Sequence, residues 1–413
     1  MNAPATIPKA ARPLPVWKSH WKSAIVVVAI IALFVFLRPR GSSARTRALA
    51  TMKEAQVSLS LQPDGTLDAA LFRNKPGIEG QMGNLSWAFD QLRRFPEVKI
   101  VRTEFLMPVN VATLRELHNL ESFSVTDRAE FDQDDFNAFA GMKNLHSLEL
   151  RGDKLSAKAI ERLKDIPKLK SLRLSGGSWG GEGMAQLANF PALEHLSLEG
   201  AARDWKEPLQ LGACRRLKSL RLVNFTAKPD DLQELELLVS LEELSLTMAH
   251  LEPHHFDSLK KLPKLKSLRI AGGVGSLDDC AAIIGSMPAL ESLAIADHSN
   301  MEPSKWLTVV GLGRIAASQS IRELEIYGAA VGDEGVKAIA KMTRIKNLTL
   351  NRVGATEASF DSIRKIEGLE QLSIYEPVWQ GKGIPQSALA KLREELARKK
   401  VMMTFGWGAG GYW

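Results

Sequence analysis

Leucines recur along this chain in a six-residue pattern, leucine-x-x-leucine-x-leucine, in which x is usually polar. The pattern stands out in three nearly identical segments 48 residues apart, Lys170–Leu174, Lys218–Leu222 and Lys266–Ile270, and further copies begin halfway between them at Leu193 and Leu241. The true period is therefore 24 residues. Within each copy the alternation predicts a strand whose leucines enter the core and whose polar side chains face solvent.

Eleven copies keep this register, at spacings of 24 or 25 residues with a single spacing of 31. A second apolar stripe follows each strand at intervals of three residues, as at Leu232, Leu235 and Leu238, and such spacing is typical of a helix. Each unit is therefore predicted as a strand, a turn, a helix and a turn. The copies begin at Leu120, Leu145, Leu169, Leu193, Leu217, Leu241, Leu265, Leu290, Ile321, Ile345 and Leu369.

A hexad of this kind, repeated at a period of roughly 20–29 residues, resembles the leucine-rich repeat. The helical stripe makes it most similar to the ribonuclease-inhibitor-like class, in a short bacterial form. The resemblance covers residues 98–375 and implies an α/β solenoid with a curved parallel sheet on the concave face and helices on the convex face. We assign residues 56–115 to an N-terminal capping segment, 116–376 to the repeats, and 377–413 to a C-terminal cap with an aromatic tail.

The two caps have patterns of their own. Alternation at 57–61, followed by Pro63-Asp-Gly65, predicts a strand and a turn. The other expected elements are a strand at 67–72, a helix at 85–95, a strand at 98–103, a helix at 387–400 and a closing strand at 401–405.

The net charge of +7 is concentrated at the N-terminus. Residues 1–55 hold nine Lys and Arg against one acid, Glu54, which leaves 54 − 9 = 45 bases and 47 − 1 = 46 acids in the rest of the chain. The repeats are thus nearly neutral, and the basic pI does not predict a nucleic-acid partner.

A fourteen-residue apolar run, Ala24–Leu37, follows two tryptophans in this basic region. Tryptophan at the membrane interface and basic residues at both ends are typical of a spanning helix. We therefore predict one N-terminal transmembrane helix at residues 17–40, between a disordered basic tail at 1–16 and a polar linker at 41–55.

Two alternatives to the anchor are a cleaved signal peptide and a buried core helix. The basic flanks disfavour a core helix, and Arg38 and Arg40 lie where a signal peptide should be neutral before its cleavage site. Four basic residues on each side leave the orientation undecided by the positive-inside rule. We expect a single-pass protein of a bacterial inner membrane, with the repeats outside the cytoplasm.

Charges alternate along one column of the repeats. Stacked strands would place each lysine between two glutamates, so we interpret this column as a device that holds the strand register rather than as a binding site. It consists of Lys170, Glu194, Lys218, Glu242, Lys266 and Glu291.

The solvent-facing side of the predicted sheet is the candidate binding surface. Arginine and tyrosine are frequent anchors of protein interfaces, and three arginines recur here on every second repeat. The candidate partner-binding residues are Glu149, Arg151, Arg173, Arg221, Arg269, Glu325, Tyr327 and Tyr375.

The sequence offers no convincing catalytic, cofactor or metal site. Gly176–Gly183 lacks the Lys-Ser/Thr of a phosphate-binding loop, and Gly311–Ala316 resembles a dinucleotide fingerprint but falls where the register requires a helix. The histidines around His254 have no standard metal-ligand spacing. Cys214 and Cys280 replace apolar residues of the helical stripe and are predicted to be buried free thiols.

Together these patterns predict a non-enzymatic, membrane-anchored scaffold that binds a protein partner through the repeat face. The alternative is an envelope or structural component that binds glycan or another surface polymer, using aromatic residues such as Trp179 and Trp306. A third interpretation is a solvated face that binds nothing.

Overall fold

The structure is a computed structural model, and its chain divides into two compact units, Met1–Ala50 and Thr51–Trp413. The predicted anchor at 17–40 lies outside the described residues. Among those that are described, no helix is both long and apolar enough to cross a membrane. The described residues are 43–73, 81–129, 134–139, 141–153, 155–177, 180–190, 192–202, 211–225, 232–248, 253–272, 276–297, 306–329, 331–375 and 384–406.

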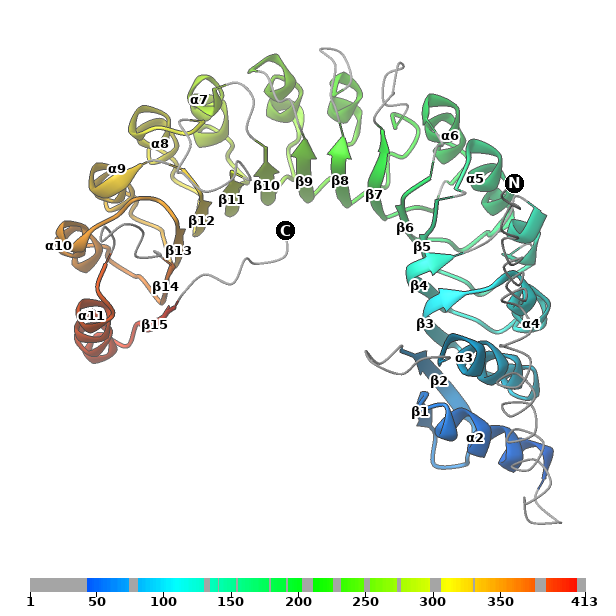
Figure 1. The fold of residues 1–413 in the computed structure, drawn as a ribbon. Helices are drawn as coiled ribbons and strands as arrows, with labels where there is room; N and C mark the ends of the chain where they lie inside the picture. Colours follow the sequence, from blue (N-terminus) through cyan, green and yellow to red (C-terminus); the bar gives the residue numbers. More distant parts are fainter. Residues whose placement is uncertain are drawn as a thin grey trace, which may run out of the picture. The chain divides into compact units, whose positions relative to one another are not determined.

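A single sheet of fifteen strands, in sequence order, runs through the described part of the second unit. The first two strands are antiparallel and every later pair is parallel. Figure 1 shows the strands on the concave side of this unit and the helices on its convex side, as the repeat pattern predicts. The strands are β1 (Ser58–Leu61), β2 (Leu67–Phe72), β3 (Ile100–Leu106), β4 (Ser122–Ala129), β5 (Ser147–Arg151), β6 (Ser171–Ser175), β7 (His195–Ala202), β8 (Ser219–Phe225), β9 (Glu243–Met248), β10 (Ser267–Ala271), β11 (Ser292–Ala296), β12 (Glu323–Tyr327), β13 (Asn347–Asn351), β14 (Gln371–Tyr375) and β15 (Met402–Phe405).

The convex side mixes α-helices with 3₁₀ helices. The α-helices are α2 (Ala44–Glu54), α3 (Gln81–Asp90), α4 (Val111–Glu116), α5 (Ala157–Arg162), α6 (Gly180–Leu187), α7 (Ala281–Gly285), α8 (Val309–Ile315), α9 (Gly332–Ile339), α10 (Phe360–Arg364) and α11 (Gln386–Arg398). The 3₁₀ helices are η1 (Gln91–Arg94), η2 (Pro108–Asn110), η3 (Asp134–Phe139), η4 (Leu163–Asp165), η5 (Gln233–Leu237), η6 (Pro253–Phe256), η7 (Ser258–Lys261), η8 (Leu277–Asp279) and η9 (Glu357–Ser359).

The spacing of the apolar stripe explains this mixture. A 3₁₀ helix has three residues per turn, so side chains at intervals of three lie on one face. Leu232, Leu235 and Leu238 have this spacing, are all buried, and accompany η5 rather than an α-helix. A helix follows the strand as predicted in most units, although none is described between β7 and β8, and the prediction did not distinguish the two helix types.

The leucines of the hexads form continuous buried columns. Leu148, Leu172, Leu196, Leu220 and Leu244 pair in register on successive strands, and each is at most 2% exposed. Burying one such side chain contributes about 1.5–3 kcal/mol. Because each leucine packs beneath its neighbours, the free energy of the array comes chiefly from contacts between adjacent units.

Both cysteines are buried free thiols, as predicted from the register. Cys214 is 3% exposed and Cys280 is 2% exposed. Burial raises the pKa of Cys214 to about 11 and that of Cys280 to about 12. Both therefore remain protonated core residues at neutral pH.

The N-terminal end of the sheet begins with a hairpin. Asp64 accepts a hydrogen bond from the Thr66 amide, 2.9 Å away, and Gly65 adopts φ +82° in the turn between β1 and β2. Residues 44–54, expected as part of a polar linker, form helix α2 instead. The hydroxyl of Ser43 accepts a hydrogen bond from the Thr46 amide at 3.1 Å, which is an N-cap contact.

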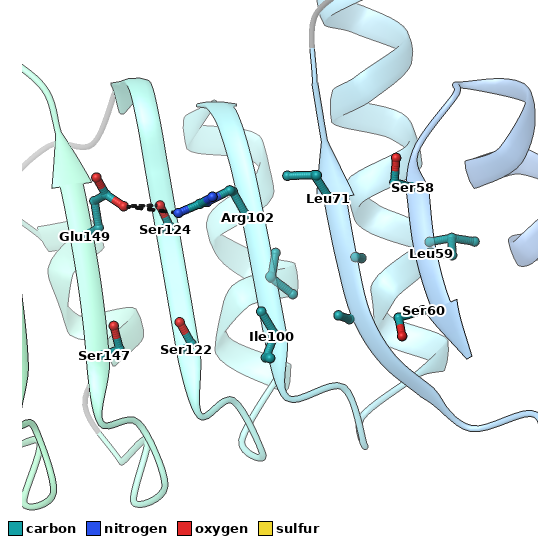
Figure 2. Close-up of a pocket in the computed structure, with 13 residues that line it drawn as sticks. Ser58, Leu59, Ser60, Leu71, Ile100, Arg102, Ser122, Ser124, Ser147 and Glu149 are labelled. Atoms are coloured by element: carbon teal, nitrogen blue, oxygen red, sulfur yellow. Dashed lines mark hydrogen bonds and ion pairs between the residues drawn. The ribbon is translucent and has the colours of Figure 1, made fainter. Parts of the chain in front are cut away.

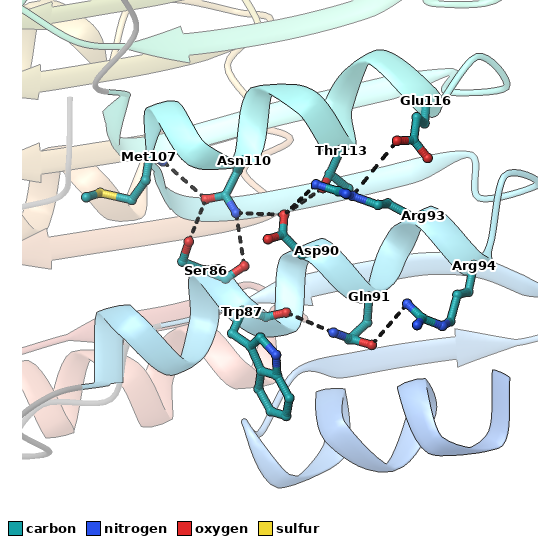
Figure 3. A network of polar contacts seen from close by, with 10 residues as sticks. All are labelled: Ser86, Trp87, Asp90, Gln91, Arg93, Arg94, Met107, Asn110, Thr113 and Glu116. Carbon is teal, nitrogen blue, oxygen red and sulfur yellow. Dashed lines mark hydrogen bonds and ion pairs between the residues drawn. The ribbon is translucent and has the colours of Figure 1, made fainter. Parts of the chain in front are cut away.

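A polar network joins α3 to η2 and α4 (Figure 3). Asn110 is only 2% exposed, and its amide group donates to the Ser86 carbonyl at 2.9 Å and to Asp90 at 3.3 Å. The Thr113 hydroxyl donates to the same Asp90 oxygen at 2.6 Å, and it accepts from Arg93 at 2.8 Å. Buried polar groups are stable when they are hydrogen-bonded, so this network helps to fix the first helices.

The unit with 31-residue spacing keeps the sheet register on both sides, because β11 and β12 pair residue for residue. Trp306, at the C-terminal side of the extra residues, is 4% exposed and belongs to the core. The segment that resembled a dinucleotide fingerprint lies in α8, as the register required.

The core assignment predicts that Leu172→Asp destabilises the array by at least about 4 kcal/mol, because a cavity and an unpaired buried charge are introduced together. Denaturant unfolding followed by circular dichroism measures this loss. Ser171→Asp places the same charge on the opposite face of β6, between Ser147 and His195, and should change stability by about 0.5 kcal/mol or less. Equal effects of the two substitutions would contradict the register.

Candidate functional site: the concave face of the sheet

One row of side chains crosses the concave face from β3 to β15, with one residue on each strand. We call this row the concave column. Its members pair in register as Arg102, Ser124, Glu149, Arg173, Ser197, Arg221, Ser245, Arg269, Ala294, Glu325, Thr349, Ser373 and Thr404. Five predicted site residues, Glu149, Arg173, Arg221, Arg269 and Glu325, thus share one surface. A serine separates each of the three arginines from the next, and Ala294 separates Arg269 from Glu325.

Glu149 is the centre of a charge cluster at the N-terminal end of the concave column. Its carboxylate lies 3.9 Å from the Arg102 guanidinium and 3.7 Å from that of Arg173. The hydroxyl of Ser124, on the strand between, donates to the same carboxylate at 2.6 Å (Figure 2). Two arginines and one serine therefore bind a carboxylate side chain here.

A second ion pair lies further along the concave column, on the C-terminal side of Arg173 and Arg221. Arg269 on β10 is 3.8 Å from Glu325 on β12, across the small residue Ala294. Burial raises the pKa of the Glu325 carboxyl, and the charge of Arg269 opposes that shift. Glu325 thus partly neutralises the arginine nearest to it.

Arg221 stands between these two clusters and is half-buried. Burial lowers the pKa of its guanidinium, and the charges of Arg173 and Arg269 lower it further, while Glu199 acts in the opposite direction. It makes no salt bridge or hydrogen bond within the described part of the chain. The side-chain oxygen of Ser245, its neighbour on β9, is buried without a hydrogen-bond partner.

Arg151, Tyr327 and Tyr375 lie at the carboxyl ends of their strands, apart from the concave column. Arg151 is exposed and lines a hollow of about 300 Å³ with Asp127, Asp153 and others. The two tyrosines flank Asn351 in register, and the side-chain oxygen of that asparagine is buried without a partner.

The sequence patterns did not indicate an apolar hollow of about 420 Å³ on β1 to β5. Figure 2 shows Leu59, Leu71 and Ile100 among the residues that line it. Ile100 is 44% exposed. The sequence feature that could have indicated this hollow is the presence of leucines and an isoleucine at outward positions of the first strands. These strands lack the leucine hexad.

The alternating charges at the amino ends of the strands form the predicted ladder. The Glu194 carboxylate is 3.3 Å from the Lys170 ammonium and 2.7 Å from that of Lys218. Lys266 is 2.8 Å from Glu242 in the next pair. These contacts link β6 to β8 and, separately, β9 to β10, so among the described ion pairs Glu194 lies between two lysines but no lysine of the column lies between two glutamates. The column's role in holding the strand register stays a prediction.

No protein-family model and no curated protein matches this chain. The chain is similar to an internalin from Listeria monocytogenes, with 14% identity, a TM-score of 0.47, and coverage of 88% of this chain and 95% of that one. It is also similar to a chain of the yeast Rad7 and Elc1 complex, with 14% identity, a TM-score of 0.50, and coverage of 93% of this chain and 91% of that one.

The mostly parallel sheet, with the described helices on its convex side, defines a repeat solenoid of the α/β class. With the leucine columns and the likeness to the yeast structure, the fold is that of a leucine-rich repeat solenoid.

The charge ladder predicts a pH-dependent contribution from Glu194. The hydrogen bonds from Lys218 and Lys170 lower the pKa of Glu194 from 4.5 to about 2. Since this pKa is depressed by folding, the stabilisation is present at neutral pH and is lost as pH falls from about 4.5 towards 2. Glu194→Gln should therefore lower the melting temperature at pH 7, and the gap from wild type should shrink below pH 4.5.

Glu243→Gln is the matched control for this prediction. Glu243 lies on β9 between Ser219 and Ser267 and forms no salt bridge with the described residues, so its replacement should have little effect on melting. A gap for Glu194→Gln that is constant with pH, or that matches the control, would refute the ladder's role.

Proposed function

We propose that this protein is a non-enzymatic scaffold that binds a partner protein through the concave face of its repeats. The observation that carries the proposal is the concave column, which runs in register across thirteen strands from Arg102 to Thr404. Its floor is a sheet whose inner strands are hydrogen-bonded on both sides, so its side chains are held at fixed spacing. A surface that is ordered before binding loses less conformational entropy when a partner binds.

The composition of this surface also favours a protein partner. Arginine is enriched in protein interfaces, and here Arg173, Arg221 and Arg269 lie in one column beside the small residues Ser197 and Ser245. A solenoid of the same fold occurs in a solved complex with another protein, Elc1.

A glycan or other surface polymer receives less support. Carbohydrate recognition through stacking needs exposed aromatic faces, but Trp306 is 4% exposed and lies in the core. The Arg352 guanidinium lies over the Tyr327 ring, 5.6 Å from its centroid. These two aromatics are therefore already packed within the protein.

We further propose that the scaffold is tethered to a membrane by residues 17–40, with the repeats outside the cytoplasm of a bacterial cell. The support is the apolar run Ala24–Leu37 with its tryptophan and basic flanks. Tethering would restrict the concave face to partners at the same membrane surface.

Concave-face binding is tested by a bulky neutral substitution. Ser197→Trp fills the floor between Arg173 and Arg221 without changing charge. It should reduce crosslinked capture of a partner from native lysate by about tenfold or more, since steric exclusion removes contacts across the interface centre. Ala188→Trp, at an exposed position just after α6 in the preceding unit, is the control and should leave capture unchanged. Equal capture by both variants would contradict binding through the concave face.

Tethering is tested by deleting residues 23–37. The full-length protein should sediment with membranes and resist extraction by high salt, because burial of the apolar run does not depend on charge. The deleted form should move to the supernatant while its circular dichroism is unchanged. Release of the full-length protein by salt alone would show that the anchor is wrong.

A further inference from the structure

Two groups of the concave column, one at its N-terminal end and one in its middle, each have a serine between two arginines. At the N-terminal end, Arg102 and Arg173 flank Ser124 and Glu149, and the serine hydroxyl and both guanidinium groups surround the carboxylate. In the middle, Arg221 and Arg269 flank Ser245 on successive strands. The first arrangement contains an acidic side chain supplied by the chain itself, and the second does not.

The charges of the column leave Arg221 without a salt bridge. From β3 to β12 the column contains four arginines and two glutamates, a net charge of 4 − 2 = +2. Glu149 forms ion pairs with Arg102 and Arg173, and Glu325 forms an ion pair with Arg269. The acid that most affects Arg221 is Glu199, and its carboxylate already accepts a hydrogen bond from the Ser175 hydroxyl at 3.1 Å.

A second, independent feature lies beside this cation. The side-chain oxygen of Ser245 is buried and has no hydrogen-bond partner, whereas the Ser124 hydroxyl donates to Glu149. A buried hydroxyl without a partner costs free energy, so such a group is notable in a native structure. Arginine offers only donors, and therefore the hydroxyl proton of Ser245 needs an acceptor that neither flanking arginine provides.

We infer that Arg221 and Ser245 bind a carboxylate side chain of an acidic segment in the partner protein. The inference rests on the proposed function, because it names the chemistry that the concave face recognises. A carboxylate can bind a guanidinium and a hydroxyl at once, as Glu149 does when it forms an ion pair with Arg173 and accepts a hydrogen bond from Ser124.

The spacing of the arginines adds a sequence preference. Arg173, Arg221 and Arg269 lie on alternate strands, which are about 4.8 Å apart, so the arginines repeat at about 10 Å. A segment in the polyproline II conformation advances about 9 Å in three residues and returns every third side chain to the same face. A segment that crosses the strands therefore matches the column when acidic residues recur at every third position, the central one at Arg221.

The surroundings favour a short acidic peptide over a nucleic acid. Glu149 and Glu325 lie at either end of the three arginines, and Glu243 lies on the strand between Arg221 and Arg269. A phosphate backbone needs an extended basic surface, and acids at both ends of the cluster would repel it. The occupant is thus short and carries separated charges.

The test measures anisotropy of a fluorescein-labelled Ser/Gly peptide with glutamate at every third position, titrated with the full-length protein. Saturable binding is expected, and replacing the glutamates by glutamine should weaken it by about tenfold or more. Arg221→Gln should cause a similar loss, and Ser245→Ala should weaken binding by about three- to tenfold. Arg344→Gln, an exposed arginine outside the column, is the matched control and should bind like wild type.

Several results would overturn the inference. These are absent binding of the glutamate peptide, equal binding of the glutamine peptide, and full binding by Arg221→Gln with unchanged circular dichroism. A single-stranded RNA oligomer that binds as tightly, with the same dependence on Arg221, would also overturn it. If Ser197→Trp abolishes partner capture and Arg221→Gln leaves it intact, the result supports partner binding through the concave face. The same result contradicts only the proposed carboxylate site.

Discussion

The structure depends on one constraint: the leucine face of a single unit cannot be buried within that unit. Leu196 and Leu220 reach less than 3% exposure only because neighbouring strands pair in register and stack their side chains. A shift of one residue between two strands would turn these leucines to the solvent. The register is thus fixed by hydrophobic burial, and every other regularity of the array follows from it.

The concave column is a direct consequence of this register. When leucines point to one side of the sheet, the residue between them must point to the other, and it faces its counterpart on the next strand. Arg221 therefore lies between Ser197 and Ser245 for reasons unrelated to binding. The register determines where these side chains lie, and the sequence is free to vary only which side chain occupies each position.

The sequence predicted much of this arrangement, because strands and their order follow from the leucine spacing. It did not predict which convex segments are 3₁₀ helices, since an apolar interval of three fits both helix types. Helix α2 was also missed, because its apolar residues are few and its cap is a single serine, Ser43. The pairing of Arg173 with Glu149 and the isolation of Arg221 depend on side-chain rotamers, which a repeat pattern does not encode.

The alternating lysines and glutamates imply a rule for how this array changes length. Strands with the ladder lysines Lys170, Lys218 and Lys266 also carry the three arginines, and strands with Glu194 and Glu242 carry serines. Loss or gain of one 24-residue unit would set lysine against lysine, whereas a 48-residue change preserves both alternations. Evolution by such duplications would lengthen the concave surface in steps of one arginine and one serine, and so match a partner whose acidic repeats grow by the same increment.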